Sequence, residues 1–491
     1  MSLSLAHYVA GEWRRGAAHK PNLDPSDTRR SNGDFPTDGL AHLEDAITSA
    51  KKAFEVWRKT PGPERGRVLF KAATIARQNK EAIARDLTAE EGKTLTEALG
   101  EVEKGICVIE FSAAQCSRLN GETVPSEMRS TLAYTVRAPL GVVGLVTPWN
   151  FPWAIPAWKA GPALAAGNTC ILKPATLTPK TSLWLAWCFE QAGLPAGALN
   201  VLLGSGAALG NAITEHTSIR AISFTGSTDV GRELAANASR ALKKVSCEMG
   251  GKNAVIVLND ADLALAATGI AQGAFGSTGQ RCTATSRVVV EKGVAADLIG
   301  RLEAIAKGYV VGPGLEKSTQ MGPAVDGKQL KTNFDYVEIA AKEGAKLVCG
   351  GKRPSSDTLA HGHFIEPTLF TGVRPKMRIA REEVFGPVLA ILEANDPAEA
   401  IAIANDTDFG LSSSLYSQDI NAVMRYIDDI DVGIVHINSP TVGGEPQLPF
   451  GGTKATGLGT REMGRQGVEF FTEEKTVYID YTAQKRTVSF Y

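Results

Sequence analysis

Hydrophobic residues recur with a helical period over the first part of the chain. Between residues 41 and 60 they return about every 3.6 positions, at Leu43, Ile47, Ala50, Phe54 and Trp57. Pro63 ends this pattern, because proline removes a backbone donor and clashes with the preceding turn. A second helical stretch, with breaks, is predicted over 65–119, where Ala, Glu, Lys and Leu are frequent. We therefore expect the first part of the chain to be mainly helical.

The pattern changes at about residue 141, where short apolar runs begin to alternate with helical segments such as 181–192. The predicted strands cover 141–146, 169–172, 199–203, 221–224, 245–247 and 254–258. An alternation of this kind favours parallel βαβ units. Near-continuous apolar strands are typical of a sheet that is covered on both faces. The pattern therefore predicts an α/β protein.

A second alternating region follows over about 253–460, with predicted strands at 287–290, 347–349, 388–392 and 433–437. Two further extended segments, 121–137 and 476–490, lie outside both alternating regions. Exposed strand edges usually pair with another subunit or are shielded. We therefore expect these segments to form a small β unit, and the protein to be a homodimer or homotetramer.

Composition excludes several classes of protein. The chain has 491 residues, 43 % hydrophobic and 21 % charged, a balance typical of a folded protein with several domains. Its formal net charge of -1 gives no general attraction for nucleic acid or an anionic membrane. Residues 1–16 lack a signal-peptide pattern, and no window has the roughly 18 consecutive apolar residues of a membrane span, so we expect a cytoplasmic protein. The 7 cysteines include no C-x-x-C pair, so neither a disulfide framework nor a metal site is expected.

Several short segments stand out along the chain. In order they are Thr147-Pro148-Trp149-Asn150-Phe151-Pro152, Phe224-Thr225-Gly226-Ser227, Glu248-Met249-Gly250-Gly251, Gly279-Gln280-Arg281-Cys282, Glu382-Glu383-Val384-Phe385-Gly386-Pro387 and Pro449-Phe450-Gly451-Gly452. Together, and in this order, they resemble the signature segments of the aldehyde dehydrogenase superfamily. The resemblance covers nearly the whole chain. It implies NAD(P)-dependent oxidation of a small-molecule aldehyde to a carboxylic acid.

The resemblance also implies an aldehyde dehydrogenase-like α/β fold, with a Rossmann-type cofactor domain, an α/β catalytic domain and a small β oligomerisation unit. It assigns residues 1–120 and 140–250 to the dinucleotide-binding domain and residues 251–460 to the catalytic domain. Residues 121–139 and 474–491 would supply the oligomerisation strands.

Cys282, Asn150 and Glu248 match the catalytic residues of the family. A thiolate suits aldehyde oxidation, because sulfur attacks a carbonyl readily and later leaves from a thioester. A free cysteine is mostly protonated at neutral pH, and Arg281 could supply positive charge beside the sulfur. Asn150 and the backbone N–H of Cys282 would hold the oxyanion. Glu248 would be the general base for hydrolysis of the thioester.

Residues 224–227 end a predicted strand and open a helix, and a helix N-terminus with small residues is a natural pyrophosphate site. The resemblance assigns this role to Gly226 and Ser227. It matches other residues to the rest of the cofactor: Gly206 near the adenosine half, Glu383 at the nicotinamide ribose, Phe385 beside the nicotinamide, and Trp149 and Lys173 on the cofactor side.

Thr176 bears on the choice of cofactor. NAD-specific relatives often have a glutamate at this position, where a carboxylate would repel the 2′-phosphate of NADP. Thr176 removes that repulsion and leaves Lys173 free to pair with phosphate. We therefore expect NADP to be accepted, with NAD as the alternative.

Arg281 directly precedes Cys282 and bears on the class of aldehyde. A guanidinium in an aldehyde tunnel is costly unless it is paired, and a carboxylate at the far end of the substrate would supply a bidentate partner. The sequence thus favours Arg281 as a substrate-binding residue and a dicarboxylic semialdehyde as the substrate. The alternative is an Arg281 that turns outward into a local salt bridge.

The stretch 279–284 is similar to that of α-ketoglutaric semialdehyde dehydrogenases, which makes α-ketoglutaric semialdehyde the favoured substrate. Succinate-semialdehyde dehydrogenases are also similar, but many carry arginines where this chain has Gly276 and Trp158. A phospho- or phosphono-aldehyde dehydrogenase is a third alternative, which would need a second basic partner. Glu248 disfavours an acylating enzyme that releases a coenzyme A thioester, and the intact catalytic set disfavours a binding protein on the same scaffold.

Overall fold

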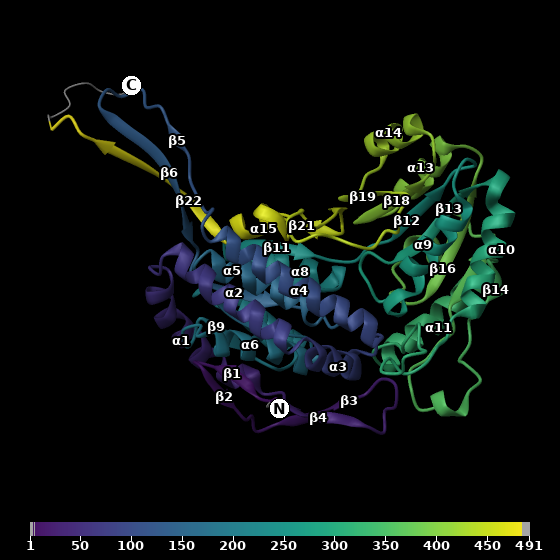
Figure 1. The fold of residues 1–491 in the computed structure, drawn as a ribbon, viewed down its shortest axis with the longest axis horizontal. Helices are drawn as coiled ribbons and strands as arrows, with labels where there is room; N and C mark the ends of the chain where they lie inside the picture. Colours follow the sequence, from purple (N-terminus) through teal and green to yellow (C-terminus); the bar gives the residue numbers. More distant parts are fainter. Residues whose placement is uncertain (1–2, 4, 484–491) are drawn as a thin grey trace.

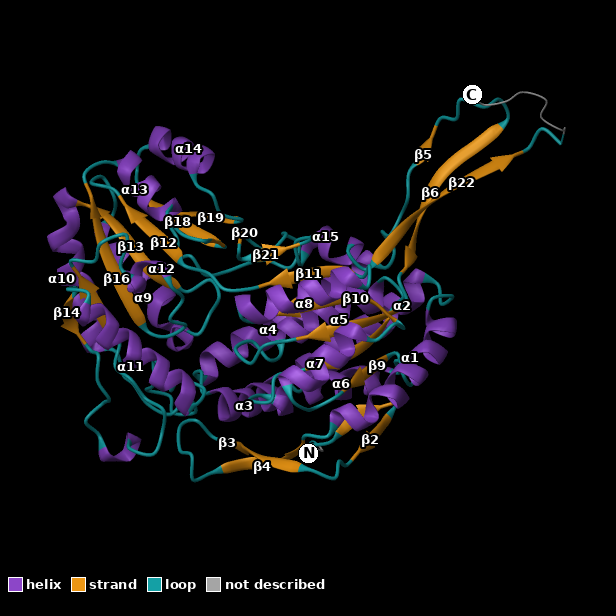
Figure 2. Ribbon diagram, turned by 180° about the vertical axis from the view of Figure 1, so that it is seen from behind, coloured by secondary structure: helices purple, strands orange, loops and turns teal. Residues whose placement is uncertain are grey.

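Two large β-sheets, each covered by helices, form two lobes of the molecule, and a thin arm projects from one of them (Figure 1, Figure 2). This computed structural model describes residue 3 and residues 5–483. The chain builds the first lobe up to residue 248, apart from one excursion into the arm, and then forms the second lobe. It returns to the first lobe before it enters the arm again.

The first lobe is built on an 8-stranded sheet whose centre is parallel. The parallel strands lie in the order β9 (Leu199–Val201), β8 (Thr169–Lys173), β7 (Val142–Val146), β10 (Ile219–Thr225) and β11 (Lys244–Glu248). β7 comes first in the chain, so the strand order reverses between β7 and β10. In open α/β sheets, ligands bind outside the carboxyl ends of the strands at such a switch point. The predicted strands coincide with these strands except at their ends.

Helices cover both faces of this sheet. One face carries α2 (Gly62–Gln78), α3 (Lys80–Glu91), α4 (Leu95–Gln115), α5 (Ala154–Ala165) and α6 (Pro179–Ala192), and the other mainly α1 (Leu43–Trp57), α7 (Gly206–Glu215) and α8 (Thr228–Arg240). The predicted helical stretch 65–119 divides because Gly92 ends α3 with a φ of 102° and Thr94 begins α4 with a capping box. None of the described helices is long and apolar enough to cross a membrane.

The sequence pattern does not predict the short strands at the start of the chain. β1 (His7–Val9) and β2 (Glu12–Arg14) extend the first sheet by antiparallel pairing beside β9, and β3 (His19–Leu23) and β4 (Ser31–Pro36) form a separate hairpin. The expected helical character therefore begins only at Leu43. Strands this short, with largely polar side chains on β3 and β4, give no apolar run from which to recognise them.

The second lobe is built on a 7-stranded sheet that is parallel except at its edge strand β14. The strands lie in the order β14 (Lys346–Cys349), β15 (Thr368–Thr371), β16 (Val388–Ala394), β13 (Thr285–Glu291), β12 (Asn253–Val257), β18 (Ser412–Tyr416) and β19 (Ile434–Ile437). The helices of this lobe are α9 (Leu263–Phe275), α10 (Lys292–Gly308), α11 (Gly327–Lys342), α12 (Arg378–Arg381), α13 (Pro397–Asn405) and α14 (Ile420–Asp429). The predicted α/β class is confirmed in both lobes.

The chain returns to the first lobe after β19. β21 (Gly457–Leu458) pairs with β11, and α15 (Gly464–Glu469) packs on α5. β20 (Thr453–Lys454), just before β21, pairs with β17 (Phe409–Gly410). The expected catalytic segment 251–460 therefore includes β21, a strand of the first sheet. The sequence does not predict this pairing, because a two-residue strand gives no recognisable pattern.

The arm is a three-stranded sheet of β22 (Thr472–Asp480), β6 (Thr131–Pro139) and β5 (Thr123–Val124), and Figure 1 shows that it extends well away from both lobes. The expected oligomerisation strands were 121–139 and 474–491, of which 484–491 lie outside the described residues. Several large apolar side chains of the arm are exposed, namely those of Val124, Leu132, Tyr478, Ile479 and Tyr481.

Candidate active site

Asn150, Glu248 and Cys282 come from different elements and meet at the junction of the two lobes. Asn150 follows β7, Glu248 is the last residue of β11, and Cys282 lies just before β13. Only residues 249–252 separate β11 from β12, so the carboxyl end of the first sheet lies against the second lobe.

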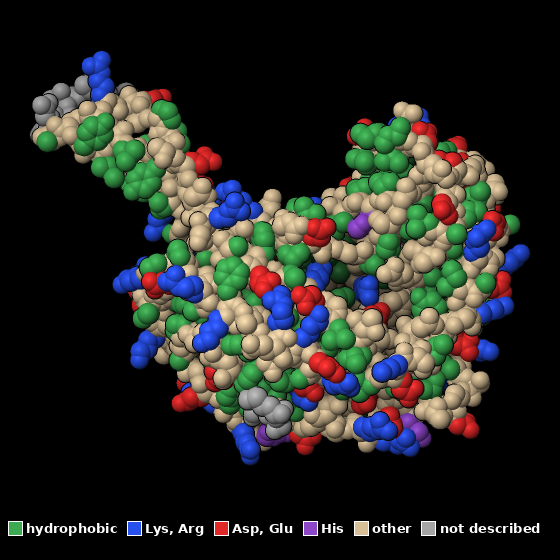
Figure 3. Space-filling view, viewed as in Figure 1, with side chains coloured by type: hydrophobic (Ala, Val, Ile, Leu, Met, Phe, Trp, Pro, Cys, Tyr) green, Lys and Arg blue, Asp and Glu red, His purple; other side chains and the backbone are tan. Residues whose placement is uncertain are grey.

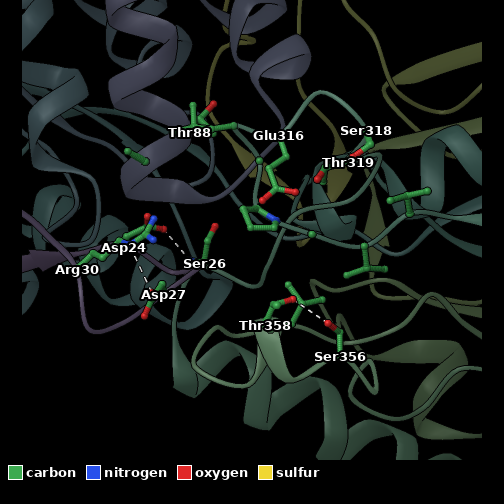
Figure 4. Close-up of a pocket in the computed structure, with 18 of the residues that line it drawn as sticks. Asp24, Ser26, Asp27, Arg30, Thr88, Glu316, Ser318, Thr319, Ser356 and Thr358 are labelled. Carbon is green, nitrogen blue, oxygen red and sulfur yellow. Dashed lines mark hydrogen bonds and ion pairs between the residues drawn. The ribbon is translucent and has the colours of Figure 1, made fainter.

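A cavity of about 260 Å³ lies at this junction. Its lining includes Asn150 and Cys282, together with the predicted cofactor residues Trp149, Gly226, Ser227, Glu383 and Phe385. The surface is hollowed between the two lobes, with basic side chains near the hollow (Figure 3). A larger hollow of about 530 Å³, lined by residues such as Asp24, Thr88 and Glu316, contains none of the predicted site residues (Figure 4). The smaller cavity is therefore the candidate active site.

The loop before β13 holds Cys282 in a fixed place. Gly279 adopts a φ of 66°, and an added Cβ there would collide with the backbone of Gly386, so this tight turn requires glycine. Asn253 of β12 donates from Nδ2 to the backbone oxygens of Cys282, at 2.7 Å, and Ala284, at 2.8 Å. These contacts bind the cysteine loop to the sheet of the second lobe.

Asn150 is buried beside the cysteine loop, and a buried ion pair fixes its backbone. Its Nδ2 donates to the backbone oxygen of Gln280 at 3.0 Å. Lys93 donates from Nζ to the backbone oxygen of Asn150 and to Glu101 Oε2, both at 2.6 Å. The other oxygen of Glu101 accepts the backbone N–H of Trp153 at 2.9 Å. The amide of Asn150 is thus held where it can donate to an oxygen formed next to Cys282.

Glu248 is buried, and its Oε2 has no hydrogen-bond partner among the described residues. Burial raises the pKa of its carboxyl well above the usual value, and Glu462 raises it further, whereas Lys159 and Arg461 oppose the shift. An added Cβ on Gly451 would collide with the carboxylate, so only glycine fits against it. A carboxyl with a raised pKa and a free oxygen is suited to take a proton from water.

A buried ion pair between Lys159 and Glu462 lies close enough to Glu248 to influence its pKa. Ser223 of β10 accepts from Lys159 Nζ at 2.8 Å and donates to Glu462 at 3.0 Å, and Trp158 Nε1 donates to the same carboxylate at 2.8 Å. The sequence does not reveal this group, because Lys159 and Glu462 are 303 residues apart and no local pattern connects them. The available signal was Lys159 itself, the charged residue of the otherwise apolar helix α5.

The surroundings of Cys282 keep its sulfur protonated. Burial raises the pKa of the thiol to about 12, and the carboxylates of Glu248 and Glu383 contribute to that rise. The positive charge that opposes them belongs to Lys104, a residue that sequence reasoning did not select. Ionisation of this thiol therefore requires further positive charge or hydrogen bonding when the site is loaded.

The guanidinium of Arg281 is bound by Ser277 and Glu97. Its Nε and Nη2 donate to Ser277 Oγ at 3.0 and 2.8 Å, and Nη2 also donates to Glu97 Oε1 at 3.3 Å. These contacts favour the alternative that the sequence left open, a local salt bridge, over a role of Arg281 in charging the thiol or binding the substrate. The physical reason is that the guanidinium already has a carboxylate partner, which removes its need for an anionic ligand.

The N-terminus of α8 opens into the cavity beside the switch point of the first sheet. Gly226 donates its backbone N–H to the backbone oxygen of Glu248 at 3.1 Å. Ser227 precedes the helix but caps it with no side-chain hydrogen bond, so the first-turn N–H groups have no side-chain acceptor there. This arrangement fits a pyrophosphate.

Glu383, Phe385 and Trp149 form the opposite part of the cavity. The rings of Trp149 and Phe385 meet edge to face, with centroids 5.4 Å apart. Glu383 accepts the backbone N–H of Gly251 at 2.9 Å, and burial raises the pKa of its carboxyl to about 7. An added Cβ on Gly250 would lie 2.5 Å from this carboxylate, so glycine keeps the cradle open. An aromatic wall beside a carboxylate fits a nicotinamide ribose.

Lys173, Thr176 and Gly206 are not among the lining residues of the cavity. Lys173 ends β8, and its buried Nζ donates to the backbone oxygen of Pro174 at 3.0 Å. Burial lowers the pKa of this ammonium to about 8. Thr176 and Gly206 are exposed, and Gly206 is the first residue of α7. All three lie at or just after the carboxyl ends of β8 and β9, on the side of the switch point where an extended dinucleotide would continue.

Comparison with known proteins identifies the family. The profile of the aldehyde dehydrogenase family matches residues 13–477. The chain belongs to the aldehyde dehydrogenase family. This aldehyde dehydrogenase is 42 % identical to the alpha-ketoglutaric semialdehyde dehydrogenase of Bacillus subtilis (strain 168), over 96 % of this chain and 97 % of that protein. It is 38 % identical to the NADP(+) succinate-semialdehyde dehydrogenase of Escherichia coli (strain K12), over 96 % of this chain and 97 % of that protein.

Solved structures share the whole fold of this aldehyde dehydrogenase. The betaine aldehyde dehydrogenase of Staphylococcus aureus in complex with NAD+ superposes with a TM-score of 0.96 at 32 % identity, covering 99 % of this chain and 97 % of that one. The predicted aldehyde dehydrogenase fold is confirmed. The protein is an NAD(P)-dependent enzyme that acts on small-molecule aldehydes.

Replacing Lys93 with methionine should destabilise the enzyme and slow it. The change leaves the carboxylate of Glu101 buried without its cation, which typically costs about 3–5 kcal/mol. It also releases the backbone of Asn150, and misplacement of such a group can lower kcat by about a hundredfold. Thermal unfolding and steady-state kinetics measure the two effects. The control is Lys80→Met, which breaks a partly exposed pair with Glu103; equal behaviour of the two variants would show that Lys93 does not position Asn150.

Proposed function

We propose that this enzyme oxidises a dicarboxylic semialdehyde, with α-ketoglutaric semialdehyde as the favoured substrate, to the dicarboxylate through a thioester on Cys282. The observation that carries the substrate class is the similarity, over nearly the whole chain, to enzymes named for such semialdehydes. Cys282 and Asn150 line the same cavity, and Glu248, next to the lining residue Met249, acts electrostatically on the Cys282 thiol, which supports the chemistry.

In the first half of the reaction, Cys282 attacks the aldehyde carbon once its thiol has lost the proton. The carbonyl oxygen becomes an oxyanion, which the Asn150 amide and the backbone N–H of Cys282 would stabilise. Donors of this kind commonly lower a barrier by about 2.7–4 kcal/mol each. Trp149, Glu383 and Phe385 would hold the nicotinamide cofactor, which would supply the hydride acceptor. Loss of hydride from the thiohemiacetal carbon leaves a thioester on Cys282.

In the second half, Glu248 takes a proton from a water molecule that attacks the thioester carbonyl. The carbon–sulfur bond breaks, the carboxylic acid leaves, and Cys282 is regenerated. The free oxygen of Glu248 and its raised pKa support this role, because a general base works best with a pKa near the working pH. Hydrolysis on this path needs no coenzyme A.

We further propose that NADP is accepted, with NAD as the alternative. No carboxylate occupies position 176, where Thr176 is exposed, so nothing there repels a 2′-phosphate. The ammonium group of Lys173 belongs to a residue only three positions before Thr176 in the chain. The similarity to an enzyme named for NADP(+) and to a structure in complex with NAD+ is compatible with use of both.

Among the alternatives, succinate semialdehyde is supported by the 38 % identity to an enzyme named for it. A phospho- or phosphono-aldehyde is less well supported. A phosphate would need two basic partners, and Arg281 is already paired with Glu97.

The arm supports the proposal of a homodimer or homotetramer. Its outer strands β5 and β22 leave unpaired edges within the described sheet, and its apolar side chains are exposed, with Tyr478 at 63 %. Exposed edges and apolar patches of this kind are usually covered by another subunit. Residues 121–139 and 474–483 would form that contact.

Glu248→Gln should separate the two halves of the reaction. We expect a burst of reduced cofactor of up to one equivalent per subunit, followed by turnover at least about a hundredfold slower than wild type. Since the pKa of Glu248 is raised, wild-type kcat should fall as the pH is lowered through that pKa, and the variant should lose this dependence. Stopped-flow absorbance measures both. Cys282→Ala is the control and should give no burst, and a burst from it would contradict the nucleophile assignment.

A screen of aldehydes tests the substrate class. We expect kcat/KM for α-ketoglutaric and succinic semialdehydes to exceed that for pentanal and butanal by roughly tenfold or more, because a charge-assisted contact contributes about 1.5–3 kcal/mol. The free acid should form at full rate without coenzyme A. Equal or better turnover of the neutral aldehydes would refute the semialdehyde proposal.

Thr176→Glu should turn the enzyme towards NAD. A carboxylate at this position would repel the 2′-phosphate, so we expect KM for NADP to rise roughly tenfold or more while KM for NAD stays within about threefold. Thr176→Gln, which has the same size without the charge, is the matched control. If both variants affect the two cofactors alike, Thr176 does not lie at the adenosine ribose.

A further inference from the structure

Lys104 is a partly buried cation that the mechanism above does not use. It lies on α4, three residues after Glu101 and four before Val108, so it shares the helix face that packs towards the cysteine loop. Val108 belongs to the apolar cluster that also contacts Cys282, together with Ala154, Ile155, Trp158, Leu411, Phe450 and Met463. The side chain of Lys104 therefore points to the apolar approach to the sulfur.

Aromatic rings and a glycine surround the ammonium. Nζ lies 5.3 Å from the ring centre of Trp158 and 5.9 Å from that of Phe450, and the two rings are themselves 5.5 Å apart. A Cβ on Gly444 would lie 3.5 Å from Nζ, so glycine leaves the space beside the charge unfilled. The rings attract the cation through their faces, but they offer it no full counter-charge.

Within residues 5–483, Lys104 makes no hydrogen bond or ion pair, in contrast to the other buried lysines near the site. Lys93 is paired with Glu101, and Lys159 with Glu462. Glu101, the acid nearest to Lys104 along α4, is already occupied by Lys93 and by backbone N–H groups. Burial of an unpaired ammonium is costly, and it lowers the pKa of Lys104. An anion that enters beside it would offset that cost.

The charge of Lys104 is also directed at the reacting centre. It lowers the pKa of the Cys282 thiol, whereas the guanidinium of Arg281 is held by Glu97 and Ser277. Lys104 has no such carboxylate partner among the described residues, so its charge is available to a ligand that approaches the sulfur.

We propose that Lys104 binds the distal carboxylate of the semialdehyde, whose carbon chain lies against Trp158 and Phe450 while its aldehyde reaches Cys282. This inference rests on the proposed function and names the residue that sets its substrate class. A single ammonium matches one carboxylate, whereas a phosphate would be better served by several donors. The apolar rings suit the methylene carbons between the two ends of the substrate.

Matched substrates and variants test the assignment. Glutaric semialdehyde and pentanal have the same chain length and differ in the terminal carboxylate. Lys104→Met keeps the apolar stem, and it should lower kcat/KM for glutaric semialdehyde roughly ten- to hundredfold, mainly through KM, with less than about threefold change for pentanal. Lys104→Arg should restore most of the loss. Arg281→Met is the control and should not change the ratio between the two substrates.

Equal losses with both substrates in Lys104→Met would overturn the inference, because they would show that the lysine acts only on the reactivity of Cys282. If wild type itself shows no preference for the semialdehyde, the proposed function fails, and a second measurement still decides the role of Lys104. Glutarate should slow alkylation of Cys282 by iodoacetamide in wild type but not in Lys104→Met, as followed on the Cys282 peptide by mass spectrometry. Protection in both proteins, or in neither, would refute carboxylate binding by Lys104.

Discussion

The short connection between β11 and β12 is the constraint on which the rest of the site depends. Residues 249–252 carry the chain from the last strand of one sheet into the first strand of the next. Glu248 is thereby fixed at the joint, and an added Cβ on Gly251 would lie only 2.7 Å from the backbone oxygen of Cys282. Glycines allow this close approach because they have no side chain. The proposed base Glu248 and the proposed nucleophile Cys282 therefore lie close enough to interact electrostatically without a long loop between their lobes.

Paired buried charges give that junction its electrostatic character. Lys93 with Glu101 fixes the backbone of Asn150, and Lys159 with Glu462 influences Glu248 from the other side. Both pairs are almost fully buried, so each charge depends on its partner. Lys104 differs because no described carboxylate pairs with it, and this difference is what makes it a candidate for the substrate. The same physical rule thus separates cations that hold the site together from one that can bind a ligand.

Local segments carry most of the candidate site. Cys282, Asn150 and Glu248 each lie in a short stretch with recognisable neighbours, and the helix after β10 follows a glycine in a strand-to-helix turn. For Arg281 the sequence left two alternatives open, because adjacency to Cys282 along the chain says nothing about the direction of a side chain. In the structure the guanidinium turns to Glu97, which lies 184 residues away in sequence. The sequence also does not point to Lys104 or Glu462, because neither residue lies in one of the signature segments.

The sequence by itself determined the alternation of strands and helices, the family and the identity of the candidate catalytic residues, because these depend on periodicity and on contiguous motifs. Tertiary structure decided which charges are paired. The sequence does not distinguish Lys93, Lys104 and Lys159 from one another. Only the packing shows that Lys93 and Lys159 each pair with a carboxylate. It also decided the pairing of β21 with β11 and the short strands at the start of the chain, because pairing over a few residues depends on distant partners rather than on a local pattern.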